Sequence, residues 1–351
     1  MRRWWSLACV FALAAAPLVA PGVATACACG GLISPDPSLR VADEMALVAG
    51  DGTTETVVMR LNLDTSADNA ALVVPTPAPA TVTGADPDVF DELAALSAPR
   101  VEKLRRWTWG WANAEAPSGE GVMIGAVPGA PTVLSQVQLG PLEATTLSGG
   151  DLAGVREWLS GNGYDLRPEI SAGLDPYLRA GWSVVAMRLT TDGEPLDGPL
   201  APVTLRFASD ELMYPMRMSA EASTPQTVVV YTLGEHKTRR IDRDAADQYV
   251  NLDYAGPLAG RTGDTTLLGL SDSGDYLTKT TTSIVDPEHI TSDFLFGPAP
   301  DDDPFQAVVY DYEYRNLTLP ALGAVAAVIV AGATWTVILI SRRVRRRTRA
   351  R

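Results

Sequence analysis

Residues 44–64, EMALVAGDGTTETVVMRLNLD, place two apolar runs on either side of an Asp51-Gly52 pair. Asp-Gly is favoured in tight hairpin turns because glycine accepts the positive φ angles that such turns require. The stretch therefore predicts a β-hairpin, and strand signals dominate the sequence around it.

Further apolar runs extend this prediction on both sides of the hairpin. We expect strands in AALVVPTPAPATV (70–82), WSVVAMRL (182–189), VTLRFA (203–208), QTVVVYTLG (226–234) and QAVVYDYEY (306–314). In the first of these runs, Pro75, Pro77 and Pro79 remove alternate hydrogen-bond donors, so the chain must leave the sheet there.

Two helices are predicted among these strands. One covers about 87–97, with Asp86 as its cap, Pro87 at its first position and an apolar face of Phe90, Leu93 and Leu96. The other follows Ser148, with an apolar stripe of Leu152, Val155 and Leu159. We therefore expect an α+β, sheet-rich domain in which two or three helices pack against antiparallel strands.

The two ends of the chain predict export and a single anchor. Residues 1–26 have a short basic region, an apolar stretch and Ala24-Thr25-Ala26, which is typical of a cleavable signal peptide. Residues 317–340 carry no formal charge and are long enough to form a transmembrane helix. The arginine-rich tail, 341–351, indicates a cytoplasmic C-terminus. Residues 27–316 would then form one extracytoplasmic domain on a single-pass protein of the cell membrane.

One motif at the start of this apolar span has an alternative reading. Residues 319–323, LPALG, resemble the Leu-Pro-x-Thr-Gly signal that sortases cleave, but Leu322 stands where that signal has threonine. A retained membrane anchor is therefore the favoured interpretation.

Charge is distributed unevenly along the chain. The formal net charge is −14, but two arginines lie in the predicted signal and seven in the tail, which leaves 19 cations against 42 acids in the exported part. Nucleic acid and anionic lipid headgroups are therefore not expected partners of this surface. The chain has only three lysines among its 28 basic residues, a bias that suggests a GC-rich genome and an actinobacterial cell envelope.

Several blocks in order resemble the bacterial family known as domain of unknown function 2330. They are ACGG (28–31), DGTTETVVMRL (51–61), AALVVPTPAPATV (70–82), VFDELAALSAPRV (89–101), LSGNGYDL (159–166), LDPYLRAGWSVVAMRL (174–189), GPLAPVTLRF (198–207) and MYPMRM (213–218). Thr76 departs from the family's Val-Pro-Val-Pro run. The resemblance implies an exported, C-terminally anchored architecture, but no catalytic residue, ligand or cofactor.

The sequence offers no motif that predicts catalysis, a cofactor or a metal site. His236 and His289 are its only histidines, and both are interpreted as polar residues of a turn or a helix start. Residues 269–274, GLSDSG, do not fit a hydrolase elbow. The acidic segments 64–69, 272–275 and 301–304 lack the spacing of an EF-hand calcium loop.

Aromatic residues recur with period two in two places. Trp107, Trp109 and Trp111 would share one face of a strand. Packing into the core is the favoured interpretation, and an exposed stacking platform for a glycan or another protein is the alternative. Residues 310, 312 and 314 are tyrosines near the predicted membrane span, which suggests a last strand or an interfacial belt.

Cysteine usage predicts a local clip at the mature N-terminus. Cys9 leaves with the signal, so Cys27 and Cys29 remain in an oxidising compartment, which favours an intramolecular disulfide between them. The single intervening residue strains that ring. A lipid on Cys27, metal binding, and pairing between two chains are the alternatives; Ala24 is not the leucine-like residue that a lipobox normally has at that position.

The favoured function is a non-enzymatic binding or structural module of the cell envelope, with an envelope glycan or a surface protein as its partner. The first alternative is an extracytoplasmic hydrolase of envelope polymers that works through two carboxylates. The second is a thiol or copper-handling surface protein that uses Cys27 and Cys29.

Overall fold

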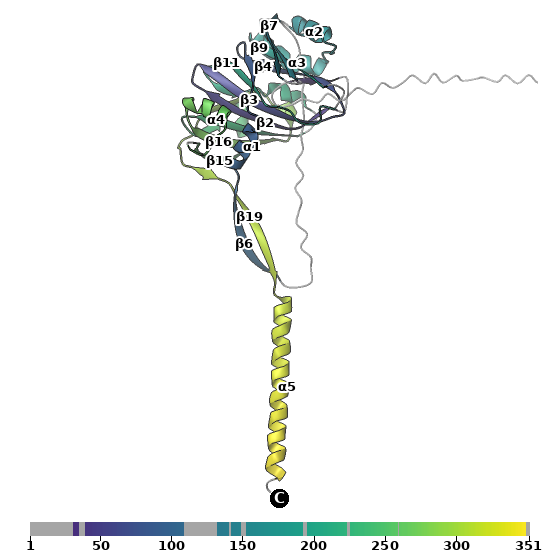
Figure 1. Ribbon diagram of the computed structural model, residues 1–351, viewed down its shortest axis with the longest axis vertical. Coiled ribbons are helices and arrows are strands. Elements are labelled where there is room, and N and C mark those ends of the chain that lie inside the picture. The colour runs from purple at the N-terminus through teal and green to yellow at the C-terminus, as the bar shows by residue number, and fades with distance from the viewer. Residues whose placement is uncertain are drawn as a thin grey trace, which may run out of the picture.

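The computed structural model describes residues 31–34, 39–108, 132–139, 142–148, 152–191, 195–222, 225–258 and 260–348. It consists of a head, a narrow two-stranded stalk and a single long helix, arranged end to end (Figure 1). The predicted α+β class is confirmed, because several sheets and packed helices make up the head.

A large sheet forms the centre of the head, with the strand order β18-β15-β16-β13-β2-β3-β11-β5 and with β10 paired to β3. Its pairs are antiparallel except for β13 and β2, which run parallel. Its strands are β2 (Arg40–Gly50), β3 (Thr54–Asp64), β5 (Thr81–Gly84), β10 (Gly198–Pro199), β11 (Val203–Ala208), β13 (Gln226–Gly234), β15 (Tyr249–Pro257), β16 (Tyr276–Ile284) and β18 (Phe305–Gln306).

The predicted hairpin is β2 and β3, in the middle of this sheet. Gly50 pairs with Glu55 across the turn. Both faces of the hairpin are buried: Ala46 and Val48 lie in one apolar cluster, whereas Leu47 lies in a second cluster on the opposite face. Because successive side chains of a strand point to opposite faces, a run of consecutive apolar residues here makes the sheet the middle layer of the head.

Two smaller sheets complete the head. The first has the order β1-β4-β9-β8-β7, and its strands are β1 (Gly31–Ile33), β4 (Asn69–Thr76), β7 (Thr132–Leu139), β8 (Leu142–Ser148) and β9 (Ser183–Thr190). The second has the order β12-β17-β14, with β12 (Leu212–Tyr214), β14 (Thr238–Arg240) and β17 (Phe294–Pro298).

Helices cover both sides of the large sheet. The helices of the head are α1 (Val89–Leu96), α2 (Leu152–Gly161), α3 (Pro168–Arg179) and α4 (Thr265–Leu270), with 3-10 turns η1 (Arg217–Glu221), η2 (Arg243–Ala246), η3 (Ser271–Ser273) and η4 (Pro287–His289). Buried residues of α2 and α3 join the cluster that lies between the large and five-stranded sheets. Buried residues of α1 and α4 join the cluster on the other face.

The two predicted helices are α1 and α2. The predicted apolar face of α1 is confirmed, because Phe90, Leu93 and Leu96 are buried. Its predicted start is wrong by two residues: the helix begins at Val89 after an Asp88 cap. Helix α3 is not predicted from the sequence, because its internal Pro176 is unusual for a helix interior.

A buried ion pair lies within the small sheet, and a partly buried one joins this sheet to η1 and α3. Arg240 in β14 donates to Asp242 from Nε at 2.9 Å, and the two side chains are 1% and 0% exposed. Arg217 donates from Nε to Asp293 at 2.8 Å, and Tyr177 of α3 donates to the same carboxylate. Removing one partner of the Arg240–Asp242 pair would leave an uncompensated charge in the protein interior, so this contact holds β14 in place.

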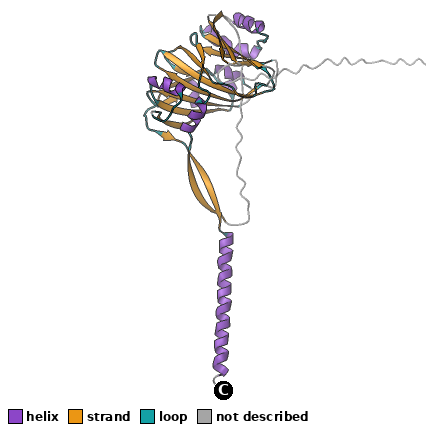
Figure 2. Cartoon of the chain, viewed as in Figure 1, coloured by secondary structure: helices purple, strands orange, loops and turns teal. Residues whose placement is uncertain are grey.

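The stalk joins the head to the last helix. It is a parallel pair of strands, β6 (Arg100–Thr108) and β19 (Val308–Asn316), which leave the head side by side (Figure 2). The predicted last strand is therefore confirmed. Helix α5 (Thr318–Thr348) follows, and its residues Thr318–Arg343 are long and apolar enough to cross a membrane.

Candidate functional site

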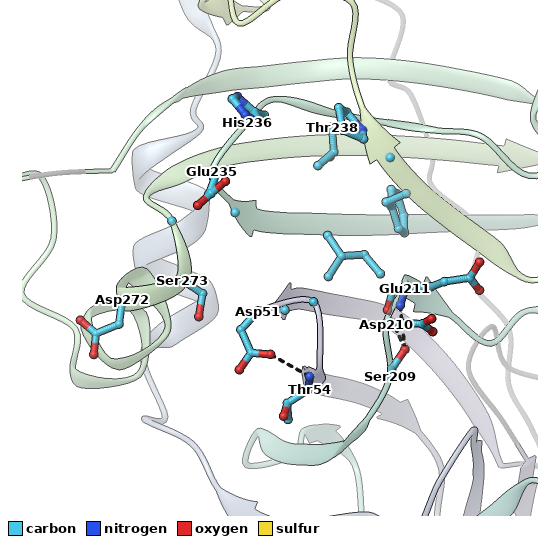
Figure 3. Close-up of a pocket in the computed structure, with 18 of the residues that line it drawn as sticks. Asp51, Thr54, Ser209, Asp210, Glu211, Glu235, His236, Thr238, Asp272 and Ser273 are labelled. Atoms are coloured by element: carbon cyan, nitrogen blue, oxygen red, sulfur yellow. Dashed lines mark hydrogen bonds between the residues drawn. The ribbon is translucent and has the colours of Figure 1, made fainter.

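A cavity of about 910 Å³ opens at the end of the large sheet, beside the η3 turn that follows α4; Figure 3 shows the residues that line it. Five turns or strand ends from distant parts of the sequence surround it. Its lining comes from residues 50–54, 209–212, 234–238, 271–275 and 296–298.

The hairpin turn between β2 and β3 forms one wall of the cavity. Oδ1 of Asp51 accepts hydrogen bonds from the backbone N–H groups of Thr53 and Thr54, at 2.9 and 2.8 Å, and from the Thr53 hydroxyl at 2.7 Å. The Thr53 hydroxyl and these N–H groups hold the pKa of Asp51 below its ordinary value. Gly52 has a φ of 79°, as the Asp-Gly signal predicts.

A close contact between two backbone segments shapes the opposite wall. Gly274 follows η3 with a φ of 132°, and a Cβ atom built there would lie 2.1 Å from the carbonyl carbon of Gly234. Only glycine allows this approach, which brings the 271–275 turn against the end of β13. The side chains of Glu235 and Asp272 consequently flank the same side of the cavity (Figure 3).

Carboxylates dominate the charge of this cavity. Glu235 and Asp272 lie on one side, and Asp210 and Glu211 on the other (Figure 3). Within the described part of the chain, none of these four side chains forms an ion pair. Unneutralised carboxylates around a concave surface make its potential negative and attract cations.

Among the described residues, His236 is the one basic side chain of the lining, and it does not offset these carboxylates. Nδ1 of His236 lies 2.8 Å from Oδ2 of Asp302, which is itself an acid. The hydrogen bond from His236 and a second one from the Lys237 backbone keep the pKa of Asp302 below its ordinary value. The cavity therefore suits a positively charged ligand and disfavours an anion.

A buried acid lies behind the cavity wall. Glu55 follows Thr54, which lines the cavity, and its side chain is fully buried. Its Oε1 accepts a hydrogen bond from the backbone N–H of Met213 at 2.9 Å, while Oε2 has no partner among the described residues. Burial raises its pKa to about 8, although the bond from Met213 opposes this shift.

The described residues do not bring a set of metal ligands or the two histidines together at this cavity. Within the described ranges, no group of three or more His, Cys, Asp or Glu side chains is placed to hold a metal ion. His289 ends the short turn η4 and lines a separate cavity of about 490 Å³, so the two histidines belong to different sites.

The residues singled out from the sequence do not meet at the cavity. Cys27, Cys29, Trp109 and Trp111 lie outside the described residues, so their predicted disulfide and platform stay predictions. Trp107 is in the stalk, at the end of β6, and its side chain is 60% exposed. The favoured interpretation that Trp107 packs into the core is therefore wrong for this residue.

The sequence reasoning noticed several lining residues without connecting them. It assigned Asp51-Gly52 to a turn, considered 272–275 for calcium and placed His236 in a polar turn after a strand. The turn at Asp51-Gly52 and the position of His236 after a strand agree with the structure. These residues line one cavity because of the order of the strands in the sheet. The sequence around each turn does not predict that order.

Comparisons with known proteins identify a family but no activity. The family described as "Uncharacterized protein conserved in bacteria (DUF2330)" matches residues 23–297. No curated protein matches the chain. Crystal structures of baculovirus P35 show a weak similarity: one of P35 has a TM-score of 0.35 at 8% identity, covering 77% of this chain and 97% of that chain. A mutated P35 after caspase cleavage has a TM-score of 0.32 at 7% identity, covering 75% and 98%.

These structural similarities are too low to support any argument about function, whereas the family match covers most of the chain. The protein therefore belongs to the bacterial DUF2330 family.

Proposed function

We propose that this protein is a membrane-anchored extracytoplasmic binding module, whose acidic cavity captures a positively charged segment of another envelope protein. In this proposal α5 spans the cell membrane, the head lies outside, and the arginine tail lies in the cytoplasm. Residues 1–26 are removed as a signal peptide.

The observation that carries the proposal is the arrangement of head, stalk and helix in one line (Figure 1). Each stalk strand has nine residues, and the two strands pair along their whole length. At about 3.3 Å per residue, the stalk holds the head roughly 30 Å from the start of α5. An enzyme acting on lipids would need its site at the membrane, whereas such a spacer serves a head that meets partners in the envelope.

The charge of the head and its cavity supports a cationic partner. The exported part carries 19 cations against 42 acids. The cavity adds carboxylates that form no ion pair among the described residues, and they come from three separate turns that carry Glu211, Glu235 and Asp272. Complementary charge of this kind raises association rates and selects partners more than it raises affinity.

The hydrolase alternative has weaker support. A general acid needs a carboxyl group that is protonated at neutral pH and within reach of the substrate. Glu55 meets the first condition, because its pKa is about 8. It fails the second, because its side chain is 0% exposed behind the cavity wall. The thiol or copper alternative depends on Cys27 and Cys29, which lie outside the described residues; an intact mass before and after reduction and alkylation tests it.

The orientation in the membrane is tested on intact protoplasts. External protease should destroy the head and spare a tag placed after Arg351. A digested tag together with a protected head would contradict the proposal.

The binding step is tested with the purified full chain in nanodiscs. A fluorescent peptide of alternating lysine and glycine is the probe, and its affinity should fall steeply with added salt. The double variant Glu235→Gln, Asp272→Asn should weaken binding at least about tenfold. The matched control Glu157→Gln, Asp165→Asn removes the same charge from exposed positions in α2 and the loop after it. Equal losses in both variants would assign the binding to overall charge and refute the cavity as the site.

A further inference from the structure

The last three residue pairs of the stalk differ in charge from the rest of the exported chain. They are Arg106 with Tyr314, Trp107 with Arg315, and Thr108 with Asn316. These pairs contain two arginines, two aromatic residues and no acid. We call these six residues the stalk foot. The negative net charge of the exported part disfavours anionic lipid as a partner of the head. The end of the stalk nearest α5 is nevertheless positively charged.

The acids higher in the stalk are already neutralised. Lys103 lies 3.5 Å from Asp311 and 3.7 Å from Glu313, and Arg105 lies 3.8 Å from Glu313. The stalk therefore has balanced charges in the part nearer the head, whereas the stalk foot carries positive charge only.

Both faces of the foot present aromatic surface. Partners in a strand pair share a face, so Trp107 and Arg315 lie on one side of the ribbon and Arg106 and Tyr314 on the other. Trp107 is 60% exposed and Tyr314 is 53% exposed. Tryptophan and tyrosine are the side chains that collect at membrane–water interfaces, because each has an apolar ring and a polar group.

The register places these side chains at the level of the bilayer surface. Trp107 lies opposite Arg315, and α5 begins three residues later at Thr318. At about 3.3 Å per residue, the Trp107 backbone is on the order of 10 Å above the start of α5. The polar layer of a bilayer adds roughly 5–8 Å on each side of the hydrocarbon core. The Trp107 backbone therefore lies roughly 2–5 Å outside the polar layer, close enough for its side chain to meet the headgroups when the stalk tilts.

We propose that the stalk foot is a second membrane contact, which binds the anionic headgroups of the outer leaflet surface through Arg106 and Arg315 and inserts Trp107 and Tyr314 between them. The inference rests on the proposed span by α5. Both stalk strands would then contact the bilayer: β19, which leads into α5, and β6, which does not. This contact restricts tilting of the stalk and keeps the head upright.

The test replaces Trp107 or Val101 with a benzophenone amino acid in the full-length protein. Val101 is the matched control, because it lies on the same face of β6 and is 59% exposed, but is six residues farther from the membrane. The protein is reconstituted in liposomes of phosphatidylcholine with 0 or 30% phosphatidylglycerol, irradiated, and analysed by mass spectrometry for lipid adducts.

We expect at least about tenfold more lipid adduct at position 107 than at 101, and an increase with phosphatidylglycerol. The double variant Arg106→Gln, Arg315→Gln should remove that increase, while an unchanged melting temperature shows an intact head. Equal amounts of lipid adduct at positions 107 and 101 would overturn the inference. An amount at position 107 that does not change with the phosphatidylglycerol content would also overturn it. A cross-link between two protein chains at 107, in place of lipid, would also overturn it by assigning the foot to a second copy.

Flotation of the liposomes separates this inference from the proposed function. Protein that floats but gives no adduct at 107 retains its anchor and lacks the second contact. Protein that fails to float contradicts the span by α5 itself.

Discussion

Replacing Glu55 by glutamine should remove a large part of the pH dependence of the head's stability. Burial raises the pKa of Glu55 from 4.5 to about 8. Between these values the folded protein binds a proton that the unfolded chain releases, so the free energy of unfolding falls as pH rises. The stabilisation is complete below pH 4.5 and lost as pH approaches 8.

The size of the effect follows from the same two values. One group that differs by one proton changes stability by about 1.4 kcal/mol per pH unit. From pH 5 to pH 8 the wild-type head should therefore lose roughly 3.5 kcal/mol through Glu55 alone, since the folded acid is still about half protonated at pH 8. Glutamine resembles the protonated acid and can still accept the Met213 N–H bond, so Glu55→Gln should lack this loss.

The assay is urea unfolding of the full chain in nanodiscs at pH 5, 6, 7 and 8. The difference between wild type and Glu55→Gln isolates the group, because other titrating residues contribute equally to both. The control is Glu235→Gln, which changes an exposed carboxylate of the same cavity and should run parallel to wild type. Parallel curves for wild type and Glu55→Gln would show that Glu55 is ionised throughout and refute the reasoning.

Three further substitutions test the packing of the head and stalk by thermal and urea unfolding. Gly274→Ala should destabilise by at least about 2 kcal/mol, because its Cβ would overlap backbone; Gly269→Ala, whose Cβ meets nothing within 4 Å, should be neutral or slightly stabilising. Asp242→Ala should cost about 3–5 kcal/mol, since it leaves the buried Arg240 unpaired, and a loss below 1 kcal/mol would contradict that role. Trp107→Ala should change stability by less than about 1 kcal/mol, against the roughly 3–5 kcal/mol expected of a core tryptophan.

Local pattern alone was enough to predict the main elements. The Asp51-Gly52 turn, the helix face of Phe90, Leu93 and Leu96, and the long apolar segment near the C-terminus all appear where the sequence places them. Turn residues, the spacing of apolar residues in a helix and the length of an apolar segment depend on neighbouring residues only, so they can be predicted from the sequence. Helix α3 was missed because Pro176 interrupts the usual signal, while its buried contacts stabilise it.

The tertiary structure decided everything that depends on contacts between distant segments. The cavity exists because strand order brings the turn at Asp51 beside Glu235 and Asp272. Glu55 resembles any strand carboxylate in sequence, and only burial beneath Met213 raises its pKa. Trp107 fits the pattern of a core strand, but β6 pairs with β19 outside the head and leaves it exposed. Period two fixes which residues share a face, whereas only the assembled sheet determines whether that face meets another layer, water or a membrane.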